Sequence, residues 1–346
     1  MIQKFTVSRD DNIYEAWPDL VMTEKGKLIC TFTECAHHGD RTNSRIMITE
    51  SLDRGRTWSK KQPLSFLTQR DFPFNNSRIA RLPDNSLVVI CDRVDSSQGG
   101  ESGPNTCVYL WKGNQEGTTW SEPVILPNLK CIVPDKVKIL KCGRWVIGGH
   151  FKNVDTGKLE QYLWYSEDEG KTWSERITVA ADNRYNLCEV SILEMPDETL
   201  VAFMRENSGQ GIDCLKAISH DHGNTWEGVY NTPIPACHRP VAGFLSDGDI
   251  LLTYRFMQGG KGWLGGWTQN LFAAIFDVNS ALATARNEQN ANILPIDHDR
   301  SAAADLGYSG WVQFDDGEIY VVTYLVDDAP KAQIRGYSFY KTEARL

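Results

Sequence analysis

The chain has 346 residues and a formal net charge of −9, and 41% of its residues are hydrophobic and 23% charged. This is the composition of an ordinary globular protein. The negative charge argues against a nucleic-acid partner, because phosphates require a basic surface. No apolar run approaches the roughly 18 residues that span a bilayer, so we expect no membrane partner either.

The N-terminal stretch MIQKFTVSRDDNIYEAW lacks the apolar core of a secretory signal, which predicts a cytoplasmic location. The nine cysteines are an odd number and include no CxxC pair, so we expect mostly buried thiols in a reducing compartment. His37 and His38 are adjacent and would point apart on a strand, and no third ligand is evident. We therefore expect neither a metal site nor a cofactor.

Six strand–turn–strand units follow one another along the chain. Each has an apolar strand, a turn containing Gly, Asp or Asn, and a second β-rich strand. The units span residues 20–34, 79–93, 137–151, 190–206, 241–255 and 311–325. Helical periodicity is nearly absent between them, so the pattern predicts an all-β protein.

A Ser-x-Asp-x-Gly-x-Thr-Trp box recurs between the units. Intact copies run over 51–58, 166–173 and 219–226, and a degraded copy runs over 113–120. Ser and Asp side chains accept backbone N–H bonds in tight turns, glycine takes positive φ, and tryptophan buries a large apolar face. The other acidic residues of the box vary between copies, which argues against a calcium site. The box is therefore interpreted as a structural turn.

The regular spacing of units and boxes predicts a ring of similar β-sheets. Six four-stranded units closed into a ring form a six-bladed β-propeller, which we expect as a single domain over residues 1–346. The segment QKFTVSR, residues 3–9, is expected to pair with the last blade and close the ring.

In a propeller the innermost strands line the central axis, and polar residues at their starts converge at one mouth. In this chain, polar or charged residues precede the first apolar strand of every unit. They are found in the stretches 15–19, 75–78, 134–136, 186–189, 238–239 and 308–309. We therefore predict a functional site at this mouth.

The boxes resemble those of the Asp-box, or bacterial neuraminidase repeat, proteins. Blade by blade, the whole chain resembles the sialidase superfamily of six-bladed propellers. The resemblance implies an exo-acting glycoside hydrolase with a glycan or oligosaccharide substrate. Such an enzyme releases a terminal sialic acid or related acidic sugar by a retaining mechanism through a tyrosine nucleophile.

The resemblance also implies roles for individual residues. Tyr308, at the start of the last inner strand, matches the family's nucleophile, and Glu189 matches the carboxylate that polarises it. Arg205 matches a substrate-binding arginine, and Asp40 has the offset of the family's acid/base aspartate. His37 and His38 are alternative acids, and His38 is also a candidate substrate contact.

The sequence departs from the family at two of its three substrate-binding arginines. Glu15 or Ala16 stands where the first is expected, and Gln269 and Asn270 stand where the third is expected. This departure puts sialic acid cleavage in question. Other side chains near the predicted mouth are candidates for binding an anionic sugar or sugar hydroxyls: Arg78, Arg239, Arg93, Arg255, Glu15, Asp19 and Asp135.

Two other functions remain open. One is a propeller glycosidase for a different sugar or a polysaccharide lyase, which would use a histidine among His37, His38, His150 and His238. The other is a non-catalytic carbohydrate-binding propeller. The combination of Tyr308, Glu189 and Arg205 weighs against the binder, because a binder has no need of a paired phenol and carboxylate.

Overall fold

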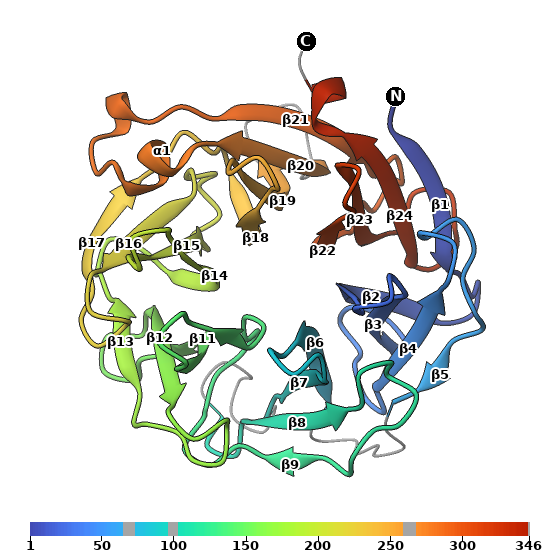
Figure 1. Cartoon of the computed structure of the whole chain (residues 1–346), viewed down its shortest axis with the longest axis horizontal. Helices are drawn as coiled ribbons and strands as arrows, with labels where there is room; N and C mark the ends of the chain where they lie inside the picture. The colour runs from blue at the N-terminus through green and yellow to red at the C-terminus, as the bar shows by residue number, and fades with distance from the viewer. Residues whose placement is uncertain (65–72, 96–102, 259–267, 345–346) are drawn as a thin grey trace.

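The computed structural model describes residues 1–64, 73–95, 103–258 and 268–344. These residues form six four-stranded antiparallel sheets arranged around a central axis (Figure 1). Helix is confined, in the described ranges, to α1 (Val278–Leu282) and short 3-10 turns such as Arg286–Glu288 and Lys341–Ala344. The prediction of an all-β, six-bladed propeller is confirmed.

The blades follow one another around the ring in chain order, each running from an inner to an outer strand. The first blade consists of β2 (Tyr14–Met22), β3 (Leu28–Cys35), β4 (Arg45–Ser51) and β5 (Gln62–Pro63). The second consists of β6 (Phe74–Arg81), β7 (Leu87–Arg93), β8 (Cys107–Gly113) and β9 (Val124–Ile125). The third consists of β10 (Lys138–Ile139), β11 (Trp145–Lys152), β12 (Leu159–Ser166) and β13 (Ile177–Ala180). The fourth consists of β14 (Leu187–Glu194), β15 (Leu200–Glu206), β16 (Leu215–Ser219) and β17 (Glu227–Asn231). The fifth consists of β18 (Cys237–Phe244), β19 (Ile250–Gln258), β20 (Thr268–Phe276) and β21 (Asn292–His298).

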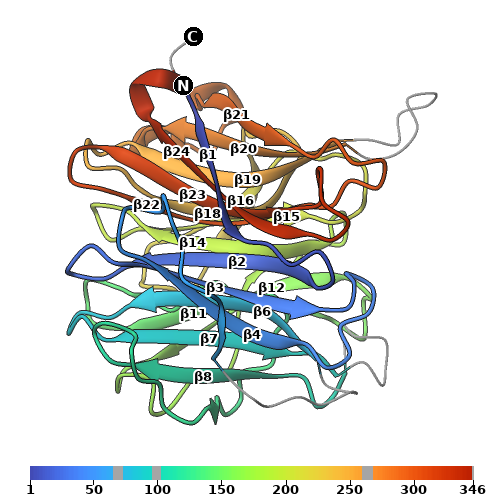
Figure 2. The same ribbon diagram turned by 90° about the vertical axis from the view of Figure 1, so that its right-hand side faces the viewer.

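The sixth blade closes the ring by joining both ends of the chain. It contains β22 (Leu306–Gln313), β23 (Glu318–Leu325) and β24 (Gln333–Tyr340), with β1 (Gln3–Ser8) as its outer strand. β1 pairs antiparallel with β24, and the N- and C-terminal segments lie side by side (Figures 1 and 2). The predicted pairing of the N-terminal segment with the last blade is confirmed. Closure of this kind protects the sheet edges.

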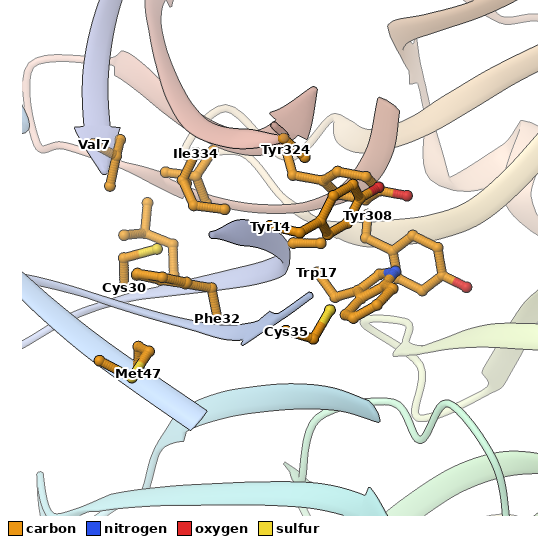
Figure 3. Packing of buried hydrophobic residues seen from close by; sticks show 14 of the residues in the cluster. Val7, Tyr14, Trp17, Cys30, Phe32, Cys35, Met47, Tyr308, Tyr324 and Ile334 are labelled. Atoms are coloured by element: carbon orange, nitrogen blue, oxygen red, sulfur yellow. The ribbon is translucent and has the colours of Figure 1, made fainter. Parts of the chain in front are cut away.

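The core lies between neighbouring blades. The middle strands are buried on both faces, and all eight residues of β3 and all seven of β7 are buried. One apolar cluster runs from Val7 on β1, through Phe32 on β3, to Trp17 and Tyr308 at the axis (Figure 3). The packing that joins the last blade to the first therefore also supports residues at the predicted mouth.

The box at 166–173 forms the predicted turn. Ser166 Oγ accepts from the N–H of Gly170 at 2.9 Å, and Asp168 accepts from the N–H of Thr172 at 2.8 Å. Gly170 has φ +81°, and Trp173 is buried. Hydrogen bonds from Thr172 and Ser166 lower the pKa of Asp168 to about 2, so the carboxylate stays charged and holds the turn.

Three further properties concern the described ranges. No helix there is long and apolar enough to cross a membrane. No group of three or more His, Cys, Asp or Glu side chains there is placed to hold a metal ion. Seven of the nine cysteines are buried, as expected from the sequence.

Candidate functional site

The inner strands bulge where they begin. The pairing of β2, β6, β14, β18 and β22 with their neighbours is interrupted between Ala16 and Asp19, Phe74 and Ser77, Cys188 and Val190, His238 and Val241, and Gly307 and Ser309. Four residues in these bulges have left-handed backbone conformations: Trp17 (φ +57°), Glu189 (+46°), Arg239 (+52°) and Tyr308 (+55°). Such conformations are costly for residues other than glycine and often occur at functional sites. Bulges also change the direction in which individual side chains point.

A cavity of about 260 Å³ lies where these bulges converge. Trp17 and Tyr308 belong to neighbouring inner strands and lie at the axial end of the cluster in Figure 3. The cavity is lined by Trp17, His38, Arg41, Asn75, Val94, Ile132, Val133, His150, Cys188, Glu189, Arg205, Asn207 and Tyr308. The sequence placed Tyr308, Glu189, Arg205 and His38 at this mouth, and the structure brings these four together.

Tyr308, Glu189 and Arg205 form a connected triad. The Tyr308 hydroxyl donates a hydrogen bond to Glu189 Oε1, and Arg205 Nη1 donates to the same oxygen at 2.8 Å. Arg205 reaches Glu189 because Cys188, the preceding residue on β14, pairs with it across the sheet. The sequence separation of Glu189 and Arg205 thus corresponds to one hairpin.

The charges around the triad set its protonation. Burial alone would raise the pKa of Glu189, but the charges of Arg205 and Arg255 outweigh it and lower the pKa well below its usual range. Burial and the Glu189 carboxylate raise the pKa of Tyr308. At neutral pH the pair is therefore a phenol donating to a carboxylate, which is the arrangement of a nucleophile with its base.

Two more guanidinium groups flank the Tyr308 ring. Arg239 and Arg255 lie 5.7 and 5.6 Å from its centroid. Arg255 also donates to the carbonyl of Leu306 at 3.3 Å, just before Tyr308. Positive charge at this distance stabilises a phenolate more than a phenol.

Two histidines near the triad are held neutral. His150 lines the cavity, and its Nδ1 accepts from the backbone N–H of Glu189 at 3.3 Å. Burial lowers the pKa of His150 to about 4. Burial and the charges of Arg205 and Arg255 lower the pKa of His238 to about 2, and His238 does not line the cavity.

His38 belongs to a hydrogen-bonded group that the sequence did not reveal. Its Nδ1 lies 2.6 Å from Asp305 Oδ2, and Asp305 also accepts from the hydroxyls of Tyr14 and, at 2.9 Å, Tyr324. Burial would raise the pKa of Asp305, but the hydrogen bond and charge of His38 outweigh it and lower the pKa. A carboxylate on Nδ1 leaves Nε2 as the nitrogen available to a ligand. The available signal was the position of Asp305, three residues before Tyr308.

Arg41 is a second residue that sequence reasoning missed. It comes from the loop between β3 and β4, donates to Asn75 Oδ1 and lies 5.5 Å from the Trp17 ring centroid. It brings a second guanidinium to the cavity beside Arg205. The available signal was its position next to Asp40 in the same loop.

Asp40 lies in an exposed turn and does not line the cavity. Its Oδ1 accepts from the N–H of Thr42 at 3.2 Å. The loop between β3 and β4 thus contributes His38 and Arg41 to the cavity lining, whereas Asp40 is exposed outside that lining.

The other predicted carboxylates are buried away from the cavity. Asp19 and Asp135 accept the N–H groups of Ile79 and Ile192, on the next blades, each at 2.9 Å. Glu15 pairs with Lys61 at 2.5 Å. These carboxylates hold blades and strands together.

The predicted arginines at the second and fifth blades are also buried. Arg78 donates to the carbonyl of Ser309 at 3.2 Å and lies 3.3 Å from Asp19, and Arg239 donates to the carbonyl of Pro134 at 2.8 Å. Both guanidinium groups join inner strands across the axis. They lie outside the cavity lining.

Gln269, one of the two residues expected from the resemblance to replace the family's third arginine, has a structural role. Its side chain donates to the carbonyl of Ala304 at 2.8 Å and accepts from the N–H of Leu306 at 2.9 Å. These bonds fix the segment that carries Asp305 and leads to Tyr308.

Known structures share this architecture. A protein of unknown function from Dyadobacter fermentans is 20% identical, with a TM-score of 0.78 over 97% of this chain and 98% of that one. The intramolecular trans-sialidase of Ruminococcus gnavus is 15% identical, with a TM-score of 0.68 over 96% of each chain. An α-L-arabinofuranosidase from Fusarium graminearum is 12% identical, with a TM-score of 0.62 over 98% of each chain. At these identities the likeness establishes the fold.

The fold and its repeats define a sialidase-like six-bladed β-propeller. Residues 66–321 match the family described as BNR repeat-like domain, and the chain belongs to that family. The sequence matches no curated protein.

Proposed function

We propose that this protein is an exo-acting glycoside hydrolase that retains anomeric configuration by forming a covalent intermediate on Tyr308. The observation that carries the proposal is the Tyr308–Glu189–Arg205 triad in a cavity at the propeller mouth. A tyrosine nucleophile is a known exception to the two-carboxylate pattern of glycosidases. The trans-sialidase and the arabinofuranosidase among the similar structures support the class.

In the first step, Glu189 accepts the phenolic proton while Tyr308 Oη attacks the anomeric carbon and the glycosidic bond breaks. The leaving oxygen takes a proton from an acid on the cavity wall. In the second step, that group removes a proton from water, water attacks the anomeric carbon, and Tyr308 leaves and recovers its proton from Glu189. Arg205, Arg239 and Arg255 favour the charge that develops on the phenol oxygen.

We assign the leaving-group proton to His38, because it lines the cavity and Asp305 fixes its ring. The sequence prediction of Asp40 for this role stays a competing proposal within the same loop. Asp40 would have to turn from its bond with Thr42 to reach the cavity.

The proposed substrate is a terminal sialic acid or related acidic sugar. Arg205 and Arg41 are the guanidinium groups that line the cavity. Because they also bind Glu189 and Asn75, their hold on a carboxylate is weaker than that of three dedicated arginines. We therefore expect the enzyme to hydrolyse an aryl sialoside slowly, and a panel with neutral aryl glycosides, including an arabinofuranoside, tests the choice of sugar.

Covalent trapping tests the mechanism. A glycosyl fluoride of the cleaved sugar, with a second fluorine beside the anomeric carbon, should add one sugar mass to the protein. Peptide mapping should place that mass on Tyr308, and the Tyr308→Phe variant should remain unlabelled. Labelling of another residue, or turnover without configuration retention, would contradict the mechanism. Formation of an unsaturated uronate from a uronate-containing polysaccharide would instead establish that the protein is a lyase.

A further inference from the structure

A second, larger cavity of about 780 Å³ opens at the other end of the same inner strands. β2 contributes Trp17 to the candidate active site and Leu20–Met22 to this second cavity. β22 likewise contributes Tyr308 to the first and Trp311–Gln313 to the second. The two cavities therefore lie at opposite mouths of the ring, with the buried Arg78 between them.

Four cationic side chains line this second cavity, which we call the basic well: Arg81, Lys136, Lys138 and Lys141. No carboxylate is among its lining residues in the described ranges. Positive charge gathered in one concave site attracts anions, and it does so here on a chain whose net charge is −9.

Two of these cations are engaged by the protein and two are not. Lys136 lies 3.1 Å from Asp19, and Lys141 Nζ donates to the carbonyl of Pro196 at 2.6 Å. Arg81 and Lys138 form neither an ion pair nor a side-chain hydrogen bond with any residue that the structure describes. Arg81 is exposed and Lys138 half-buried, so both are available to a ligand.

The rest of the wall is apolar and includes one fixed aromatic ring. Leu20, Ile79 and Val137 contribute aliphatic surface. Trp311 donates from its indole nitrogen to the carbonyl of Val241 at 3.1 Å. Its ring lies so close to Gly243 that a Cβ there would come within 2.8 Å of it. The indole is therefore held in place as part of the cavity lining.

We propose that the basic well binds a small organic anion whose phosphate or carboxylate group meets Arg81 and Lys138 while an apolar planar part lies against Trp311. The combination of cations and apolar wall favours such a compound over an inorganic ion or a neutral one. This site is separate from Tyr308 and independent of the proposed hydrolase activity.

The probe is 1-naphthyl phosphate, which carries both features, compared with inorganic phosphate and 1-naphthol, which carry one each. Calorimetric titration should give the tightest binding for 1-naphthyl phosphate, weakening as salt is raised. The double variant Arg81→Gln/Lys138→Gln should bind it about tenfold more weakly or worse, since it loses two charge-assisted contacts.

The matched control is Lys60→Gln/Arg184→Gln, which removes the same charge from one exposed lysine and one exposed arginine, neither of which lines the well. It should bind 1-naphthyl phosphate like the parent, as should Tyr308→Phe. Equal binding by the Arg81/Lys138 variant and the parent would overturn the proposal. So would an absence of binding at millimolar probe, or equal affinity for 1-naphthol. Loss of binding in Tyr308→Phe would place the probe in the active-site cavity instead.

Discussion

The two mouths of the propeller are built from the same inner strands but differ in their backbones. At the mouth that holds Tyr308, the strands bulge, and Trp17, Glu189 and Tyr308 adopt left-handed conformations. Beyond the bulges, from Asp19 and Ser309 onward, pairing is regular as far as the basic well. The irregular backbone thus coincides with the hydrogen-bonded triad of Tyr308, Glu189 and Arg205, whereas regular strand forms the middle of the ring and the opposite mouth.

The two mouths also differ in how their cations are used. Arg205 and Arg41 at the first mouth are tied to Glu189 and Asn75. Arg81 and Lys138 at the other mouth have no ion-pair or side-chain hydrogen-bond partner among the described residues. Substitutions at the mouth that holds Tyr308 should therefore alter catalytic activity. Substitutions in the middle of the ring should alter stability, and those in the basic well should alter only anion binding.

The largest effect is expected at Tyr308. Tyr308→Phe removes the proposed nucleophile and should lower kcat/KM on the best substrate by about 1,000-fold or more. Thermal unfolding should stay near that of the parent, because the ring still packs. Activity within tenfold of the parent would show that chemistry does not pass through this residue.

Arg78 and Arg81 lie three residues apart on β6. Arg78 is in the middle of the ring, and Arg81 lines the basic well at the second mouth. Arg78→Met removes one of the two cations that pair with the buried Asp19, leaving Lys136 as the other, and should cost about 3 kcal/mol of unfolding free energy. Arg81→Gln should change it by less than about 0.5 kcal/mol. Urea denaturation measures the unfolding free energy of both variants. An equal loss in the two would contradict the inference that Arg78 supports the fold and Arg81 does not.

His38→Gln should lower kcat/KM by about 100-fold, because it removes the proposed acid for the leaving group. The loss should be smaller for substrates with good leaving groups, which need no proton. Asp40→Asn is the comparison within the same loop. A larger loss in Asp40→Asn than in His38→Gln would return the acid role to Asp40.

His150 should make stability depend on pH. Its folded pKa of about 4 lies below the unfolded value, so its stabilising contribution is complete above about pH 6.5 and is lost as pH falls toward 4. At pH 5 the loss amounts to about 2 kcal/mol relative to pH 7. His150→Asn, measured by urea denaturation at both pH values, should reduce this difference, and an unchanged difference would refute the linkage.

The smallest effect is expected at a blade turn. Ser166→Ala removes the buried hydroxyl that accepts from Gly170 and should cost about 1 kcal/mol. Lys171→Ala, on the exposed side of the same turn, should be neutral in thermal unfolding. Neither variant should change activity, since the turn takes no part in the cavity.

The sequence by itself determined the ring and part of the site. Recurring hairpins and boxes indicate six blades because each is a local pattern repeated along the chain. The positions of Glu189 and Tyr308 at strand starts placed them at the mouth, and the family resemblance added Arg205 and suggested the roles of all three. The turn role of Ser166 and Asp168 was also readable, since it depends on neighbours within the box.

Only the tertiary structure decided which polar residues at the strand starts line the cavity and which hold the blades together. Asp19 and Asp135 resemble site residues in sequence, yet they hold the next blade through backbone N–H groups. Asp305 meets His38 across the junction of the last blade with the first. These outcomes depend on contacts between blades distant in sequence and on bulges that turn individual side chains. A local sequence pattern encodes neither the contacts between blades nor the bulges. The contacts form only when the closed ring brings the strand starts together at one mouth.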